Sequence, residues 1–298
     1  MPDLLDEIRQ RILLCDGAMG TQLQAAGLKP GESGDAWNLT FPERVLAIQK
    51  RYVAAGSDCL TTNTFQASRL ALAAHGLEDK VGEINRRGAE IARAAFEGGP
   101  GLVLGDMGPF GGLMEPYGTT TVDEVTSAFA EQAKALVEAG ADAIIIETMT
   151  ALEELEIAIR GAREAGARCV IASVAFDLSH DATQVRTMMG VSPAQAIDSI
   201  QKAGADVAGT NCGAGVDISW AARILEEYRR SSDLPLLAQP NAGKPTLSGG
   251  EIVYHTEADA MASGVPGLIE AGARMVGACC GSTPEHIASF RRLLDRLI

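Results

Sequence analysis

Aromatic and basic residues are both scarce in this chain of 298 amino acids. Only 4% of the residues are aromatic, which leaves little material for the aromatic cage that a quaternary ammonium ligand requires. Lys and Arg number 25 against 39 Asp and Glu, so the formal net charge is −14. A surface of this sign repels nucleic-acid phosphates and anionic membranes. Neither nucleic acid nor a membrane is therefore an expected partner.

Long apolar runs and targeting signals are also missing from the sequence. No apolar stretch approaches the roughly 18 residues that span a bilayer, and the acidic start MPDLLD does not resemble a secretory signal. The four histidines show no paired metal spacing, and His286 is expected to be an exposed helix residue. Six cysteines in a large chain without a secretory signal indicate a reducing compartment. We therefore expect a cytoplasmic protein.

A short phrase recurs along the chain and marks the ends of helices. Ala-Gly-Ser-Asp occurs at 55–58, Ala-Gly-Ala-Asp at 139–142 and 203–206, and Ala-Gly-Ala-Arg at 165–168 and 271–274. In each copy a helical pattern precedes a glycine suited to a left-handed cap, and an apolar, β-rich run follows it. The repeat predicts helices that alternate with strands, which is the arrangement of a parallel sheet.

Filling the intervals between these phrases gives eight pairs of strands and helices. The predicted strands are 11–15, 58–62, 102–106, 143–147, 169–174, 206–210, 235–238 and 274–278. The predicted helices are 42–55, 79–96, 122–139, 150–165, 192–203, 216–230, 257–271 and 284–297. Eight units with polar residues at several strand ends favour a single (β/α)8 TIM barrel over residues 1–298, with a doubly wound open sheet as the alternative.

Polar residues follow several of the predicted strands at a fixed distance from the helix-ending glycine. Seven residues beyond that glycine lie Asn63, Glu147, Asn211 and Cys279. In a parallel barrel these positions share the carboxyl face, where loops build the active site. Glu147 ends an isoleucine-rich strand, and its carboxylate would be costly to bury without a partner such as a substrate ammonium group.

Three further segments belong to the same predicted mouth. Asp16 and Gly17 follow the first strand and place a carboxylate beside flexible backbone, although Asp-Gly pairs are also common in turns. Asn241 follows the seventh strand and faces the mouth, with a simple turn as the alternative. The glycine-rich segment 105–120 is predicted to be a flexible rim.

Three cysteines at two strand ends have the pattern of a metal site. Cys279 and Cys280 follow an apolar run and precede Gly281. Adjacent side chains on a strand face opposite sides, so both thiols reach one ion only where the backbone turns, which Gly281 permits. Cys212 also lies between an apolar run and a glycine. Three thiolates with one open position are typical of a catalytic zinc site.

The cysteines also allow other interpretations. A disulfide between Cys279 and Cys280 is conceivable but does not fit a reducing compartment. Cys15, Cys59 and Cys169 lie in or beside apolar runs and are predicted to be core residues. Three thiolates would give a zinc site a net charge of −1, which favours alkylation of a bound thiol over activation of water. A zinc hydrolase is therefore a less favoured alternative.

Taken together, these motifs resemble the homocysteine S-methyltransferase family almost from end to end. The matching segments are Asp16-Gly17, Thr62-Asn63-Thr64-Phe65, Glu147-Thr148, Asn211-Cys212, Pro240-Asn241-Ala242-Gly243 and Cys279-Cys280-Gly281-Ser282-Thr283-Pro284. Similarity is greatest to the homocysteine-binding barrel of the cobalamin-dependent methionine synthases. The resemblance implies that Cys212, Cys279 and Cys280 hold Zn²⁺, that homocysteine sulfur takes the open position, and that a (β/α)8 barrel carries the site.

The resemblance also implies roles for nearby residues and for a methyl donor. Asp16 and Glu147 correspond to residues that bind the ammonium group, and Asn241 to a residue that fills the open zinc position before substrate arrives. No Asp-x-His-x-x-Gly corrinoid signature is present, so methylcobalamin is expected on a separate corrinoid protein. Betaine or S-methylmethionine is the alternative donor, and the few aromatic residues argue against betaine. A noncatalytic thiol-binding module is the remaining alternative.

Overall fold

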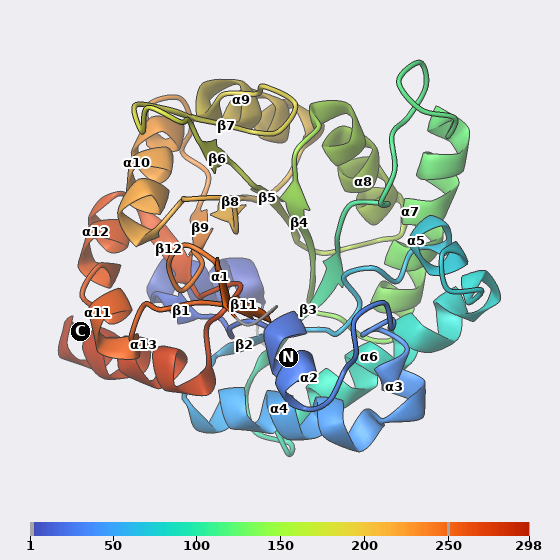
Figure 1. Ribbon diagram of the computed structural model, residues 1–298, viewed down its shortest axis with the longest axis horizontal. Coiled ribbons are helices and arrows are strands. Elements are labelled where there is room, and N and C mark those ends of the chain that lie inside the picture. The colour runs from blue at the N-terminus through green and yellow to red at the C-terminus, as the bar shows by residue number, and fades with distance from the viewer. Residues whose placement is uncertain (1–2, 249–250, 298) are drawn as a thin grey trace.

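The computed structural model describes residues 3–248 and 251–297 as a barrel of eight parallel strands surrounded by helices (Figure 1). The strands follow one another in the order β1-β12-β9-β8-β5-β4-β3-β2. They are β1 Leu13–Leu14, β2 Cys59–Thr61, β3 Leu102–Met107, β4 Ala143–Met149, β5 Val170–Val174, β8 Val207–Asn211, β9 Leu236–Gln239 and β12 Ala273–Val276. A parallel bridge between Cys15 and Cys59 joins the first and last strands of this order. The predicted TIM barrel is confirmed, and the open-sheet alternative is wrong.

The helices around the barrel begin and end close to the predicted positions. They are α4 Pro42–Ala54, α6 Val81–Ala95, α7 Val122–Glu138, α8 Leu152–Glu164, α9 Pro193–Ala203, α10 Ile218–Arg229, α11 Ala258–Ala262, α12 Val265–Glu270 and α13 Pro284–Leu297. Thr121 and Ser192 form capping boxes at the starts of α7 and α9. The glycines of the recurring phrase all have positive φ, which is the left-handed conformation that ends a helix. Within the described residues, no helix is long and apolar enough to cross a membrane.

Helix 257–271 was predicted as one element, and this prediction is wrong. The segment forms α11 and α12, separated at Ser263 and Gly264. Gly264 lies against Ile218, where an added Cβ would be 2.5 Å from the isoleucine side chain. Pro266 follows, and its ring nitrogen has no hydrogen to donate back to the preceding turn. Close packing and the missing donor together interrupt the helix.

Several short elements were not predicted because no repeat or long periodic pattern marks them. Four are helices and one is a 3₁₀ turn: α1 Leu4–Gln10, α2 Gly20–Ala25, α3 Trp37–Thr40, α5 Arg69–Ala73 and η1 Glu78–Lys80. Four short strands form two hairpins: β6 Asp177–Leu178 with β7 Val185–Arg186, and β10 Thr246–Ser248 with β11 Glu251–Val253. Both hairpins lie in loops that follow barrel strands, so they add structure to the carboxyl face.

The barrel interior changes from apolar to polar along its axis. Helix α1 lies behind the strands in Figure 1, and its Leu4 and Ile8 pack in the interior cluster with residues such as Leu104, Ile145 and Ile171. Side chains alternate along a strand, so the next inward positions lie one layer closer to the carboxyl end. Those positions are polar in five strands: Thr61, Asp106, Glu147, Ser173 and Gln239. On β8 the next inward position is Gly209, and the polar residue, Asn211, lies one step further along. The floor of the mouth is therefore polar, above a closed apolar base.

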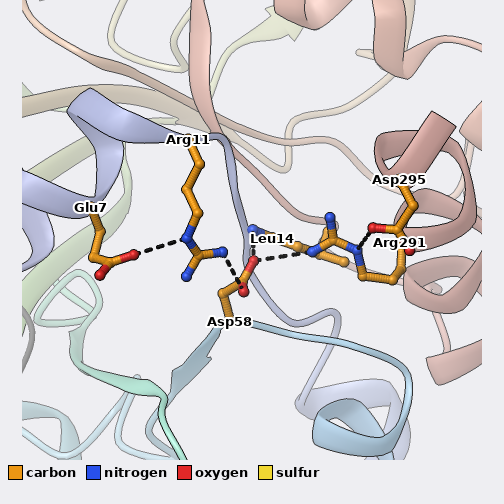
Figure 2. Close-up of polar contacts among 6 residues, drawn as sticks. All are labelled: Glu7, Arg11, Leu14, Asp58, Arg291 and Asp295. Carbon is orange, nitrogen blue, oxygen red and sulfur yellow. Dashed lines mark hydrogen bonds and ion pairs between the residues drawn. The ribbon is translucent and has the colours of Figure 1, made fainter. Parts of the chain in front are cut away.

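The first aspartate of the recurring phrase closes the barrel at its amino end (Figure 2). Asp58 Oδ2 accepts a hydrogen bond from the Leu14 amide at 2.8 Å, and its Oδ1 accepts one from Arg11 at 2.7 Å. Arg291 donates to the same carboxylate at 3.3 Å. The two arginines pair in turn with Glu7 and Asp295. Because β1 is only two residues long, this network supplements a short backbone ladder at the seam.

The other two aspartates of the phrase repeat the arrangement. Asp142 Oδ2 accepts from the Val103 amide at 2.8 Å and pairs with Arg93. Asp206 Oδ2 accepts from the Val170 amide at 2.8 Å and pairs with Arg163 at 2.6 Å. Each carboxylate thus holds the start of the preceding strand and a cation from a neighbouring helix. The aspartate of the phrase thus fixes the start of the preceding strand, an arrangement called the strand staple below, and the glycine ends the helix.

We expect Asp142→Asn to lower the free energy of unfolding by roughly 1.5–3 kcal/mol, the usual contribution of hydrogen bonds to a charged group. The Asp142 side chain is only 6% exposed, so the loss of its charge leaves Arg93 without its partner. Denaturation in urea would measure the change. Lys134→Gln, which breaks a pair whose side chains are both 68% exposed, is the control and should change stability by less than about 1 kcal/mol. Equal effects of the two substitutions would contradict the staple.

Candidate metal and thiol site

Three cysteine sulfurs meet at the carboxyl end of the barrel. Cys212 follows β8, while Cys279 and Cys280 follow β12. The Cys280 sulfur lies 3.9 Å from those of Cys212 and Cys279, and all three sulfurs lie within 4.8 Å of one another. Thiolates arranged tetrahedrally at 2.3 Å from Zn²⁺ would be about 3.8 Å apart. The spacing fits a shared zinc ion, and all six cysteines of the chain are free.

Tight backbone turns bring these sulfurs together. Cys212 has φ of +55°, which is uncommon outside glycine, and Gly213 follows with φ of +91°. A Cβ on Gly213 would lie 1.8 Å from the Phe176 carbonyl oxygen. Gly281 has φ of +79°, and a Cβ there would lie 2.1 Å from the Tyr254 ring. Glycine is therefore required after each cysteine segment, as the sequence pattern indicated.

Asn211 connects the Cys212 turn to the end of β4. Its Oδ1 accepts hydrogen bonds from the Thr148 amide at 2.9 Å and the Ser173 hydroxyl at 2.7 Å. Its Nδ2 donates to the Thr148 hydroxyl at 2.7 Å. Thr148 has φ of +61°, so these bonds hold a backbone conformation that costs of order 1–3 kcal/mol. Glu147 and Cys212, the neighbours of Thr148 and Asn211, are thereby fixed relative to each other.

Hydrogen bonds among the three thiols shift their pKa values in opposite directions. Hydrogen bonds from Cys279 and then Cys280 lower the pKa of Cys212 to about 3. The contact with Cys212 in turn raises the pKa of Cys280 to about 12 and that of Cys279 well above its usual value. Tyr254 contributes a hydrogen bond that favours the Cys280 thiolate, and Asn241 one that favours the Cys212 thiolate. Several donors thus already converge on these sulfurs.

Asn241 lies beside Cys212, at the mouth where the sequence predicted it. The segment around it is tied to the cysteine pair, because the Cys279 amide donates to the Pro240 carbonyl at 2.8 Å. Its Nδ2 donates to the Gly213 carbonyl at 3.2 Å. Its Oδ1 is buried and has no hydrogen-bond partner among the residues that the structure describes. Such an oxygen is costly unless a donor or a cation satisfies it.

Two acids predicted from the sequence, Asp16 and Glu147, lie at the same end of the barrel. Asp16 is 2% exposed, and its oxygens accept from the Thr61 amide and hydroxyl, both at 2.9 Å. Burial raises its pKa to about 7 against the effect of these bonds. Burial, followed by the charges of Cys212 and Asp16, raises the pKa of Glu147 to about 8. Neither acid forms an ion pair within the described residues, so together they favour a cationic ligand.

Gly17 allows the loop after β1 to approach the loop after the cysteine pair. A Cβ on Gly17 would lie 2.6 Å from the Ser282 hydroxyl and 3.0 Å from Tyr52. Ser282 accepts from the Ala18 amide at 2.9 Å, and the Tyr52 hydroxyl donates to the Ala18 carbonyl at 2.7 Å. The small residue therefore packs the wall of the mouth, next to Asp16.

Asn63, the remaining predicted substrate-binding residue, is held mainly by the chain itself. Its Nδ2 donates to the Gly34 carbonyl at 2.8 Å and to Asn38 at 3.1 Å. Asn38 returns a bond to the Asn63 carbonyl at 2.7 Å. These contacts anchor the loop after β2. A direct contact with substrate stays a prediction for this residue.

Two expectations about other residues are wrong. Residues 105–107 belong to the buried strand β3 and are not part of a flexible rim, because they pair with residues 144–146 of β4. His286 is 7% exposed, and its Nε2 lies 2.9 Å from the Thr256 carbonyl oxygen. Its Nδ1 lies 3.0 Å from the Thr283 hydroxyl. The imidazole therefore joins the loop after β11 to the start of α13.

Sequence reasoning also missed two polar residues of the site. Tyr254 contacts Cys280 from the end of the β10–β11 hairpin, and no motif marks that hairpin. Asp106 is 4% exposed and points into the interior from β3. A signal for Asp106 was present, because it stands alone as an acid in an otherwise apolar strand.

The fold and these groups define a class of protein: a (β/α)8 barrel whose mouth brings three cysteine sulfurs to a spacing that could hold a metal ion, beside two acids whose pKa values are raised. The chain belongs to the homocysteine S-methyltransferase family, whose model matches residues 13–294.

Individual relatives support this membership. The methionine synthase of Mycobacterium tuberculosis is 34% identical over 303 residues, which cover 96% of this chain and 25% of that protein. The methionine synthase of Mycobacterium leprae is 33% identical over 99% of this chain and 25% of its own length. The chain thus spans about a quarter of the length of these relatives. The metallated form of the Escherichia coli homocysteine methyltransferase MmuM is 26% identical, with a TM-score of 0.78 and 98% of both chains covered.

Proposed function

We propose that this protein is a zinc-dependent methyltransferase that moves a methyl group to the thiol of homocysteine and so forms methionine. The observation that carries the proposal is the set of three sulfurs at zinc-compatible spacing in the barrel mouth. Family membership supports the same substrate. We further propose that residues 1–298 act as one homocysteine-binding barrel domain in the cytoplasm, where free thiols persist.

In this proposal the chain's own residues bind and orient the amino acid. Cys212, Cys279 and Cys280 would hold Zn²⁺, which when bound keeps a coordinated thiol ionised at neutral pH. Asp16 and Glu147 would receive the ammonium group, the cation that their burial favours. The sulfur lone pair then forms the new S–C bond, and the donor keeps the electron pair of the bond that breaks. Before substrate arrives, the unpartnered Oδ1 of Asn241 would take the open zinc position.

The proposed donor is a methyl-corrinoid on a separate protein that docks over the carboxyl face. The match covers about a quarter of the length of two methionine synthases, so their printed name suggests the donor only by similarity. Large apolar side chains are exposed in the loops that follow β3, β5 and β9: Leu113, Tyr117, Met188, Met189 and Leu247. Exposed apolar groups around a mouth are typical of surfaces that another protein covers.

A comparison of donors tests the proposal. Zinc-loaded protein and homocysteine would be incubated with methylcobalamin, S-methylmethionine, S-adenosylmethionine or betaine, and methionine would be measured. We expect turnover with methylcobalamin that rises when a methylated corrinoid protein is supplied. Turnover with S-methylmethionine or betaine but none with methylcobalamin would refute the donor. Zinc and homocysteine binding without turnover from any donor would indicate a noncatalytic module.

A further inference from the structure

Strand β3 carries a buried carboxylate to which the proposed function gives no role. Leu102 and Leu104 point into the interior cluster of the barrel, and Asp106 is the next residue in that alternation. The backbone around it is fixed, because its amide donates to the Thr62 hydroxyl at 2.9 Å and its carbonyl accepts from the Thr64 hydroxyl at 2.8 Å. The carboxylate therefore enters the polar layer beneath the mouth.

The Asp106 carboxylate lacks partners within the described part of the chain. The residue is 4% exposed, and its Oδ1 is buried without a hydrogen bond. No described Lys, Arg or His forms an ion pair with it. Burial first, and then the charges of Glu147, Asp35 and Asp16, raise the pKa of Asp106 well above its usual value. Glu147 and Asp16 are the two acids proposed to bind the ammonium group. Asp106 therefore lies near enough to both to feel their charges.

The kind of ligand that satisfies this region follows from the donors and acceptors present. The oxygens of Asp16 already accept from Thr61, whereas Asp106 Oδ1 is buried and has no hydrogen-bond partner among the described residues. A primary ammonium group has three N–H donors and one positive charge. A thiol without an amino group brings neither, and would leave Asp106 unpartnered. The polar layer beneath the mouth therefore suits a thiol that carries an amino group better than a thiol that lacks one.

We propose that Asp106 is a third acceptor for the substrate ammonium group and makes the site select α-amino thiols over thiols that lack the amino group. The inference rests on the proposed function, because it takes homocysteine as the ligand. It adds a specificity-determining residue on β3 to the acids on the β1 loop and β4. The carboxyl group would lose its proton as the ammonium group arrives, since an adjacent cation favours the charged form.

Calorimetric titration of zinc-loaded protein with two thiols tests the inference without any methyl donor. L-Homocysteine carries the amino group, and 4-mercaptobutanoate has the same thiol and carboxylate but lacks it. We expect Asp106→Asn to raise the Kd for homocysteine at least about tenfold, the loss of one charge-assisted hydrogen bond. The Kd for 4-mercaptobutanoate should stay within about twofold, and zinc should remain stoichiometric. Asp106→Ser should give the same result. It provides a second test in case Asp106→Asn does not fold.

Asp142→Asn is the matched control, because it makes the same exchange at the opposite end of the barrel, at an aspartate whose side chain is only 6% exposed. It should lower stability and leave both dissociation constants unchanged. An unchanged Kd for homocysteine in both Asp106 variants, with tight binding to the wild type, would overturn the inference alone. Equal weakening of both thiols would also overturn it, because that pattern indicates a structural role. Failure of the wild type to bind homocysteine would refute the proposed function and the inference with it.

Discussion

Cys212→Ser is expected to abolish zinc binding and methionine formation together. The Cys212 sulfur lies 3.9 Å from that of Cys280, and hydrogen bonds from both other thiols already favour its ionised form. A serine hydroxyl stays protonated at neutral pH and is a poor ligand for zinc. Changes outside the ligand shell cost 10–100-fold in metal affinity, so loss of a ligand should cost more than about 100-fold. Zinc per chain and the rate of methionine formation are the measurements.

Cys169→Ala is the matched control for this experiment. Cys169 is 2% exposed in the apolar base of the barrel, where it packs with Ile145 and Ile171. We expect full zinc content and a modest loss of stability, because a buried cysteine of this kind acts as a small apolar residue. Full activity in a metal-free Cys212→Ser protein would refute the zinc mechanism. Ester hydrolysis by the wild type that a chelator removes would favour the hydrolase instead.

The barrel could be predicted from the sequence because its helix ends repeat. Each helix ends at a glycine in the left-handed conformation, and a strand follows at a fixed distance. This signal depends only on residues that are close in the sequence. Helix α1 has no such repeat, and its role depends on contacts with strands far along the chain. The break between α11 and α12 likewise depends on Ile218, which lies more than forty residues away. Features set by neighbouring residues could therefore be predicted from the sequence, whereas features set by contacts between distant segments could not.

The candidate site divides in the same way. The cysteine cluster could be predicted because its members lie between an apolar strand and a glycine, in a turn whose backbone conformation and close contacts only glycine allows. The cysteines are Cys212, Cys279 and Cys280. Tyr254 was not, because its contact with Cys280 depends on a hairpin without a motif. His286 was misjudged, because helical periodicity does not reveal that the Thr256 loop covers that side of α13. Single polar side chains are assigned reliably only when their partners are known.

Glu147→Gln is expected to weaken homocysteine binding while zinc stays in place. The substitution keeps the shape of the side chain but removes the charge that an ammonium group would neutralise. The loss of a charge-assisted bond corresponds to about 1.5–3 kcal/mol, or roughly a 10-fold to 150-fold rise in Kd. Asn211 should continue to hold Thr148, because its bonds go to the Thr148 amide and hydroxyl and not to the acid. Calorimetry with homocysteine, beside zinc analysis, measures both effects.

The zinc content of Glu147→Gln separates two roles that the geometry brings close together. The charge of Cys212 is among the causes that raise the pKa of Glu147, so the acid lies near a proposed zinc ligand as well as near Asp16. If Glu147 supports the metal, the variant will lose zinc and will weaken homocysteine and 4-mercaptobutanoate alike. If it binds the ammonium group, zinc stays stoichiometric and only homocysteine binding falls. Asp16 and Asp106 would still face the ammonium group in this variant, so we expect only a partial loss of affinity for homocysteine. A complete loss would contradict the proposal that three carboxyl groups share the ammonium group.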